Sequence, residues 1–134
     1  MPQMIFVNLP VANVTRSRMF FEALGYKINE QFSDTNGACV VVSESIYFMI
    51  LEHEKFTGFL TLPMSDPAKS TAVIMALGQD SRDGVDAFAK AALSHGGSEP
   101  KAAQDMGFMY SRMICDPDGN TFEPFWMDPA AVNG

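Results

Sequence analysis

The sequence predicts a mixed α+β fold of two βαβββ modules, whose curved, mixed but mainly antiparallel sheets would surround a cup. The first reason is that short apolar runs, typical of strands, alternate with turns rich in Asp, Asn, Gly and Pro. The second is that each half holds one segment with apolar residues at helical spacing. The third is that the element order repeats after about 70 residues, with too few copies for a solenoid. We expect the 134 residues to form a single domain.

Module one is expected to span residues 1–52 and to open with an apolar strand at 4–11. Asn13 is a suitable N-cap for a helix over 13–24, and Gly25 is placed to end that helix. Three further strands, separated by polar turns, are expected at 26–32, 38–42 and 46–51.

Module two is expected to span residues 71–128 and to repeat this order, beginning with a strand at 71–77. Ser81 can cap a helix over 82–95, whose apolar residues recur at helical spacing, and two glycines follow it. The three remaining strands are expected at 100–103, 108–114 and 121–126.

The connection between the modules, residues 53–70, is long for a compact domain and contains several apolar side chains. Exposed apolar side chains of this kind usually find a partner surface. Three roles therefore stay open: a linker held on the surface by its aromatic residues, a lid over the cup, or a contact in a dimer. The side chains in question are Phe56, Phe59, Leu60, Leu62 and Met64.

Charge and composition argue against two classes of function. A net charge of -7 without a Lys and Arg cluster is unsuited to nucleic acid. No apolar run approaches the roughly 18 residues of a membrane span, and the first residues lack the features of a secretory leader. Cys39 and Cys115 are therefore expected to be buried free thiols in a reducing compartment, and the cytoplasm is the expected location.

Four runs, in this order within a duplicated module, resemble the vicinal-oxygen-chelate superfamily. This superfamily includes lactoylglutathione lyases, extradiol dioxygenases, fosfomycin-modifying enzymes and metal-free bleomycin-binding proteins. The resemblance covers nearly the whole chain and implies the same paired-module fold. The runs are Asn8–Asn13 (NLPVAN), Arg16–Ser17, Phe20–Gly25 (FFEALG) and Asp116–Glu123 (DPDGNTFE).

In the metal-dependent members of this superfamily, four His, Gln or Glu ligands come from the first and last strand of each module. The resemblance places Phe6 and Val73 at the two first-strand positions, and neither side chain can bind a metal. The last-strand position of module one falls near residues Phe48 to Ile50, so that only Glu123 keeps the type of its family counterpart. The resemblance therefore implies a depleted metal site, and we expect no cofactor, with a divalent metal as the alternative.

The two histidines do not restore such a site. His53 begins the connection between the modules, and His95 ends the second helix, where a contact with the helix dipole is expected. An extradiol dioxygenase would need two histidines in the cup. That activity is therefore not expected.

The resemblance implies a small-molecule-binding protein of the bleomycin-resistance kind, and a homodimer is expected. The alternative is a lactoylglutathione-lyase-like or related enzyme acting through Glu123, whose apolar surroundings would disfavour the charged carboxylate and suit a general acid or base. A structural or regulatory dimerisation module is a third reading. The residues expected to bind the ligand are Phe6, Asn8, Phe48, Val73, Met75 and Phe125.

Overall fold

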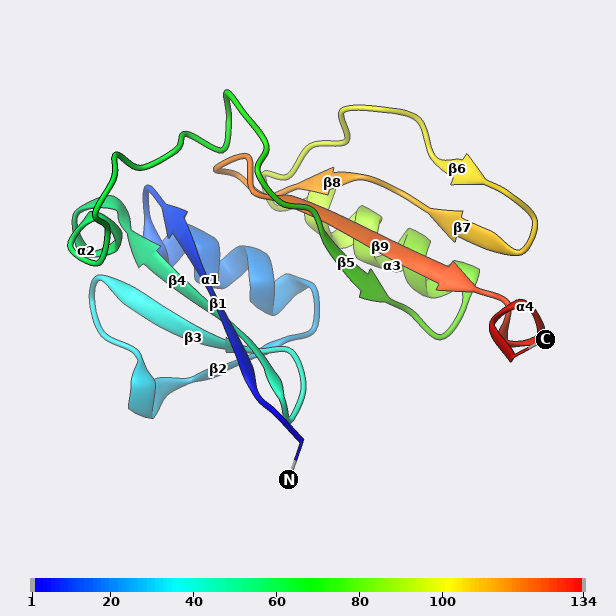
Figure 1. The fold of residues 1–134 in the computed structure, drawn as a ribbon, viewed down its shortest axis with the longest axis horizontal. Helices are drawn as coiled ribbons and strands as arrows, with labels where there is room; N and C mark the ends of the chain where they lie inside the picture. The colour runs from blue at the N-terminus through cyan, green and yellow to red at the C-terminus, as the bar shows by residue number, and fades with distance from the viewer. Residues whose placement is uncertain (1, 134) are drawn as a thin grey trace. The chain divides into compact units, whose positions relative to one another are not determined.

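The computed structural model describes residues 2–133, which form two compact units. The first unit ends at Asp66 and the second begins at Pro67, so that the boundary lies within the connection expected at 53–70. Each unit contains one sheet and one main helix (Figure 1). The two mixed sheets, of four and five strands, confirm the α+β class, and each is described by itself below.

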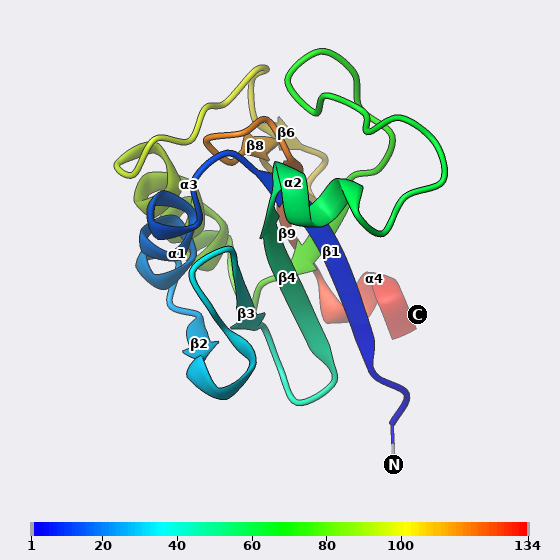
Figure 2. The same cartoon turned by 90° about the vertical axis from the view of Figure 1, so that its left-hand side faces the viewer.

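The sheet of module one has the order β1-β4-β3-β2. Strands β1 (Ile5–Val11) and β4 (Ile46–Glu52) are parallel. Strand β3 (Gly37–Val41) runs antiparallel to β4 and to the short β2 (Lys27–Asn29). Helix α1 (Val14–Ala23) covers one face of this sheet, which Figure 2 shows from the side. Strand β1 is therefore an edge strand of the sheet of module one.

Helix α1 begins and ends where the sequence predicts. The side chain of Asn13 accepts a hydrogen bond from the main-chain N–H of Arg16 at 2.9 Å, which caps the first turn. Gly25 ends the helix with φ +98°, a left-handed conformation that glycine adopts without a steric cost. On the buried side, the ring of Phe21 lies 5.9 Å from that of Phe48 on β4. This contact fixes which face of the sheet is turned toward α1.

The sheet of module two has the order β5-β9-β7-β6, with β8 also paired to β9. Its central strand, β9 (Thr121–Met127), pairs in parallel with β5 (Met75–Gly78) and antiparallel with β7 and β8, whereas β6 pairs with β7. Helix α3 (Arg82–Leu93) lies against it and is capped by the Ser81 hydroxyl, which accepts from the N–H of Gly84 at 3.0 Å. The remaining strands are β6 (Gln104–Asp105), β7 (Met109–Ser111) and β8 (Ile114–Cys115).

Strands β7 and β8 follow β9 in one continuous register. Ser111 lies opposite Phe125, and Ile114 lies opposite Phe122, with no residue inserted between the two pairings. The shared register therefore places Met113 opposite Glu123. The strand expected at 108–114 is thus present as two short pieces of one ladder.

A cluster of ion pairs holds the helix side of module two together. The guanidinium of Arg112 donates through Nε and NH2 to both oxygens of Glu99, at 2.8 and 2.9 Å, and through NH1 to Asp86 on α3 at 2.9 Å. The hydroxyl of Tyr110 donates to the same oxygen of Asp86 at 2.6 Å. These bonds connect β7, α3 and the segment before β6.

The structure differs from the expected strands at three places. The strand expected at 26–32 stops at Asn29, whose side chain accepts from the N–H of Gln31 and begins the 3-10 helix η1 (Glu30–Phe32). The first strand of module two begins at Met75 instead of residue 71. The strand expected at 100–103 was wrong, because the paired residues are those of β6, which come directly after that range.

Two short helices were not predicted. Helix α2 (His53–Thr57) forms the first part of the connection between the modules. Helix α4 (Pro129–Asn133) follows β9, where the N–H of Ala130 donates to the Asp128 carboxylate at 2.9 Å. Among residues 2–133, no helix is both long enough and apolar enough to cross a membrane.

Candidate functional site

Each sheet has one face packed on its helix and one face turned away from it, which we call the helix-free face. In module one the alternation of side chains along β4 separates the two. Phe48 is only 1% exposed and contacts α1, so its neighbours Tyr47 and Met49 point to the opposite side. The helix-free face of module one is therefore formed by Phe6, Asn8, Cys39, Val41, Tyr47 and Met49.

Two rows of side chains cross this face. In the first row, the rings of Phe6 and Tyr47 stack with their centroids 4.5 Å apart and an interplanar angle of 9°. In the second row, Asn8, Met49 and Cys39 lie side by side on β1, β4 and β3. The face thus offers aromatic, thioether and amide groups and no charged side chain in the second row.

In module two the same alternation runs along β9. Phe122 is fully buried, and Trp126, four residues later, lies 5.0 Å from the guanidinium of Arg82 on α3, so both point toward the helix. The intervening residues Glu123 and Phe125 point away from it. The helix-free face of module two is therefore formed by Ala76, Ser111, Met113, Thr121, Glu123 and Phe125.

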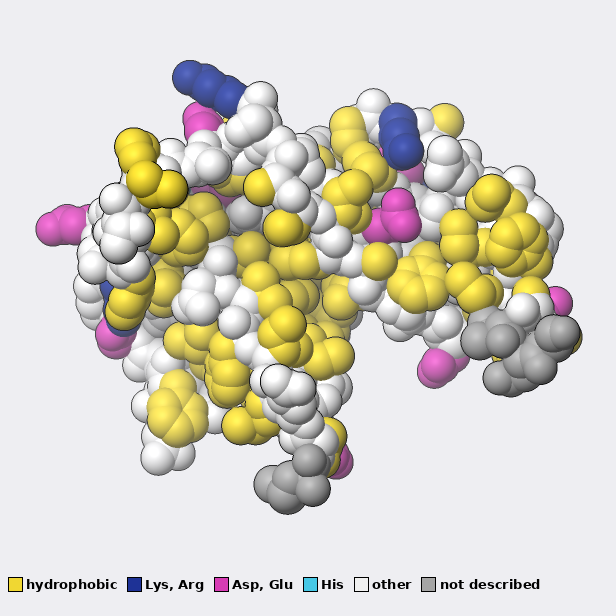
Figure 3. Space-filling model, viewed as in Figure 1, with side chains coloured by type: hydrophobic (Ala, Val, Ile, Leu, Met, Phe, Trp, Pro, Cys, Tyr) yellow, Lys and Arg dark blue, Asp and Glu magenta, His cyan; other side chains and the backbone are white. Residues whose placement is uncertain are grey.

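Hydrophobic side chains gather on the helix-free face of each module. Figure 3, drawn from the same side as Figure 1, shows them over β1 and β4 in module one. It shows a separate group over β9 in module two, next to an acidic side chain. Apolar surface with a few polar groups is the usual lining of small-molecule sites.

Glu123 is the one carboxylate on the helix-free face of module two. Its strand neighbours on that face are Ala76, by the pairing of β5 with β9, and Met113, by the register of β7 and β8. Its side chain is half-buried and makes no hydrogen bond or ion pair with any residue that the structure describes. The carboxylate oxygens are therefore available to a bound molecule.

The structure places the predicted site residues in two groups. Phe6 and Asn8 lie on the helix-free face of module one, and Glu123 and Phe125 lie on that of module two. Phe48, which was expected with them, lies on the other face of its sheet, where its ring packs against Phe21 of α1.

Two residues expected from module two also lie elsewhere. Met75 pairs with Phe122 and so lies on the α3 side of its sheet. Val73 precedes β5 and is 59% exposed. Both were placed by counting alternate residues in a strand that begins later than expected. A shift of one residue exchanges the two faces of a strand. For this reason Tyr47, Met49 and Met113 were not predicted, and the structure adds them to the helix-free faces.

The donor atoms of neither module suit a divalent metal ion. Within each unit, the described residues contain no group of three His, Cys, Asp or Glu side chains that could hold one. Phe6 occupies the first strand of module one, and its last strand presents Met49 on the same face. His95 ends α3 with Nδ1 2.9 Å from the carbonyl oxygen of Ala91, the helix-end contact expected from the sequence. Neither unit therefore contains, among residues 2–133, a set of side chains typical of a divalent metal site.

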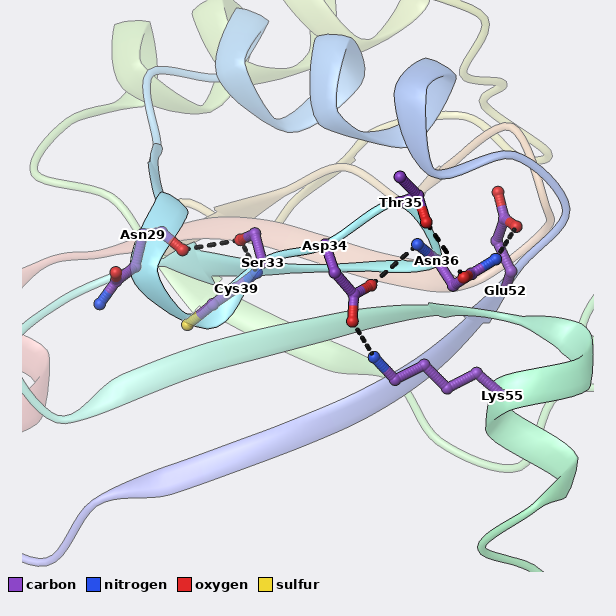
Figure 4. A network of polar contacts seen from close by, with 8 residues as sticks. All are labelled: Asn29, Ser33, Asp34, Thr35, Asn36, Cys39, Glu52 and Lys55. Carbon is purple, nitrogen blue, oxygen red and sulfur yellow. Dashed lines mark hydrogen bonds and ion pairs between the residues drawn. The ribbon is translucent and has the colours of Figure 1, made fainter.

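A polar network ties the end of β4 to the following helix α2 (Figure 4). Lys55 donates to Asp34 at 2.8 Å, and the same aspartate accepts from the N–H of Asn36. These bonds hold the pKa of Asp34 below its usual value. The amide of Asn36 in turn donates to Glu52 at 3.1 Å. Glu52, the last residue of β4, thus has a structural role and is not a free ligand.

The turn before β9 is held by a buried carboxylate. Asp116 accepts from the main-chain N–H groups of Asp118 and Asn120 at 3.0 and 2.8 Å, and from the Asn120 amide at 3.0 Å. Burial raises the pKa of Asp116 to about 6, against the opposing effect of these donors. The turn sets the start of β9, and with it the side on which Glu123 emerges.

Comparisons with known proteins agree with this fold. Residues 3–43 match the family model described as bleomycin resistance protein-like N-terminal, which is less than a third of the chain. No curated protein matches the sequence.

Many solved structures are similar over nearly the whole chain. A hypothetical protein from S. aureus is 22% identical, with a TM-score of 0.79, covering 94% of this chain and 95% of that one. A glyoxalase/bleomycin resistance protein/dioxygenase family enzyme from Burkholderia phytofirmans PsJN is 15% identical, with a TM-score of 0.76 and coverage of 94% and 99%.

A bleomycin resistance determinant encoded on the transposon Tn5 is 19% identical, with a TM-score of 0.63 and coverage of 94% and 98%. At these identities the likeness concerns the fold. Over residues 3–43 the chain is thus similar to the bleomycin resistance protein-like N-terminal family, and over nearly its whole length it shares the fold of solved glyoxalase and bleomycin-resistance proteins.

Proposed function

We propose that this protein binds a small organic molecule on a helix-free face of its sheets, in the manner of bleomycin-resistance proteins and without a bound metal. The observation that carries the proposal is the unpartnered carboxylate of Glu123, which lies between Ala76 and Met113. An apolar surface with one polar anchor gives a ligand both buried area and a defined orientation. The same composition recurs on module one, where Asn8 is the polar group.

The absence of a metal is part of this proposal, and its support is the chemistry of the side chains. Phe6 on β1 and Met49 on β4 both face away from α1. Neither is a ligand for Zn²⁺, Ni²⁺ or Mn²⁺ in an oxygen- and nitrogen-rich site. Elemental analysis of protein purified without added metal should find less than one equivalent per chain. One equivalent that is lost in Glu123→Gln would contradict the proposal.

The second candidate is an enzyme of glyoxalase I type or a related small-molecule enzyme. Its support is again Glu123, because a half-buried carboxylate without an ion-pair partner can accept or donate a proton beside a bound substrate. Without a metal, such an enzyme would have to stabilise a developing oxyanion by hydrogen bonds.

One pair of variants separates the two candidates. Compounds that bind the wild-type protein can be found by ligand-observed NMR and then tested against Glu123→Gln, which keeps the shape and removes the ionisation. The matched control is Asp83→Asn, because Asp83 is a carboxylate of α3 away from the helix-free face. If Glu123 only anchors the ligand, Glu123→Gln binds it more weakly, and neither the variant nor the wild type converts it to a product. If turnover collapses while binding persists, the protein is an enzyme. Equal binding by all three proteins would refute a role for Glu123.

We also propose a homodimer in a reducing compartment such as the cytoplasm. Support for the dimer comes from apolar side chains of the connection between the modules, since Phe59 and Leu62 are 74% and 78% exposed. Support for the compartment comes from Cys39 and Cys115, which are both free, the first of them buried. Sedimentation of the wild type and of Leu62→Ser should show a dimer that the variant weakens.

A further inference from the structure

The stacked pair Phe6 and Tyr47 lies on the helix-free face of module one. Parallel strands β1 and β4 bring the two rings side by side, with centroids 4.5 Å apart and planes within 9° of parallel. The Tyr47 hydroxyl donates to the carbonyl oxygen of Glu44 at 2.7 Å, which holds its ring in place. The Tyr47 ring, on which Phe6 stacks, is therefore held in place by its hydroxyl group.

The outer face of the Phe6 ring has no strand of module one beside it. Strand β1 is the edge of its sheet, so the row that begins with Phe6 has a neighbour only on the β4 side. Phe6, the second residue of β1, remains 45% exposed although its side chain is large and apolar. A further planar ring placed against that outer face would extend the stack by one member.

Groups next to the stack suit such a ring. The amide of Asn8, two residues along β1, makes only one long contact, from Nδ2 to the carbonyl oxygen of Phe6 at 3.5 Å. That amide is therefore free to bond a polar substituent. Met49, paired with Asn8, presents a thioether, which makes favourable contacts at the edge of aromatic rings.

We propose that the ligand of this protein carries a planar aromatic ring system, which stacks on the outer face of Phe6 with a polar substituent at Asn8. The proposal deepens the function given above and rests on it. Offset stacking contributes beyond the burial of area alone. The protein should therefore prefer an aromatic ligand over a saturated one of the same size and charge.

The test compares two neutral probes that differ only in saturation, naphthalen-2-ylmethanol and decahydronaphthalen-2-ylmethanol. Their dissociation constants are measured by NMR titration of the wild type, Phe6→Leu and Tyr47→Phe. Phe6→Leu keeps an apolar side chain and removes the ring, whereas Tyr47→Phe keeps the stack and removes only the hydroxyl. The matched control is Phe108→Leu, because Phe108 is 48% exposed but lies outside module one. Thermal unfolding checks that every variant is folded.

We expect the wild type to bind the aromatic probe about three- to tenfold more tightly than the saturated one, as the stabilisation from ring stacking implies. Phe6→Leu should remove this preference, while Tyr47→Phe and Phe108→Leu should keep it. Equal affinities for the two probes, a preference that survives Phe6→Leu, or no binding of either probe would each overturn the inference. If other compounds still bind and depend on Glu123, only the aromatic ligand class is refuted and the proposed function stands.

Discussion

The carboxylate of Glu52 accepts a hydrogen bond from the main-chain N–H of Val14 at 3.0 Å, which joins the last residue of β4 to the first residue of α1. The amide of Asn36 donates to its second oxygen at 3.1 Å (Figure 4). The first turn of a helix has N–H groups without helical partners, and here one of them is satisfied by a strand 38 residues away. This bond couples the helix to its sheet.

Replacing Glu52 with Ala should lower the thermal midpoint of the protein, because α1 loses this acceptor. The N–H of Val14 and the amide of Asn36 hold the pKa of Glu52 below its usual value. A lowered pKa in the folded state means that the stabilisation is present above the ordinary glutamate pKa and is lost as the pH falls through the folded value. Thermal scans between neutral and acidic pH should therefore show the variant and the wild type converging at low pH. The control is Glu54→Ala in α2, and an equal loss in both variants would contradict this role.

Replacing Ser17 with Ala should stabilise the protein by about 1 kcal/mol, because its hydroxyl is buried and unsatisfied. Ser17 is 0% exposed on the packed side of α1, and its Oγ has no hydrogen-bond partner among the described residues. The control is Ser94→Ala, since Ser94 Oγ donates to the carbonyl oxygen of Lys90 at 2.9 Å and its loss should be neutral or unfavourable. Urea unfolding of both variants measures the difference. A destabilised Ser17→Ala would show that the hydroxyl has a partner after all.

Replacing Gly119 with Ala should destabilise module two more than replacing Gly107. Both glycines have a left-handed backbone, with φ +94° and +82°. A Cβ in that conformation destabilises the folded state by about 1–2 kcal/mol at either position. At Gly119 the new Cβ would also lie 2.8 Å from the main chain of Ala68, whereas at Gly107 it meets nothing within 4 Å. The clash should add about 1–3 kcal/mol, measured by denaturant unfolding. Equal losses would mean that residues 67–68 move aside at no cost.

Replacing Asp116 with Asn should remove a pH dependence of stability. Burial raises the pKa of Asp116 to about 6, so the folded protein holds this proton over a range where the unfolded chain has released it. Stability from this group therefore falls as the pH rises from about 4 to about 6, by on the order of 3 kcal/mol. Unfolding free energies measured across that range should slope downward in the wild type and less so in Asp116→Asn. Parallel profiles would show that the three N–H donors keep the carboxylate charged in the folded state.

The sequence predicts elements with strong local signals. Asn13 and Ser81 cap the two long helices, and Gly25 ends the first, because side-chain capping and left-handed glycine depend on neighbouring residues alone. The short strand β6 and the start of β5 were placed wrongly, since their pairing depends on distant parts of the sheet. Helix α2 was missed because five residues carry too little periodicity.

The candidate site was predicted only in part, for a related reason. The sequence predicts that Glu123 and Phe125 share one face of β9, and they do so in the structure because the preceding turn fixes where that strand begins. For Phe48 the register of β4 was unknown, and a shift of one residue exchanges the two faces of a strand. Tyr47 was therefore overlooked, and with it the stack on Phe6, which only the pairing of β1 with β4 reveals.

Methionine-methyl NMR tests whether a small molecule binds a helix-free face without a metal. A compound found to bind is titrated into protein treated with a chelator, and into the same protein with added zinc, nickel or manganese. We expect the same dissociation constant with and without added metal. The methyl signals of Met49 or Met113 should shift, and that of Met19, which lies on α1, should not. Binding that appears only with one equivalent of metal, or shifts that leave both Met49 and Met113 unchanged, would contradict the proposed function.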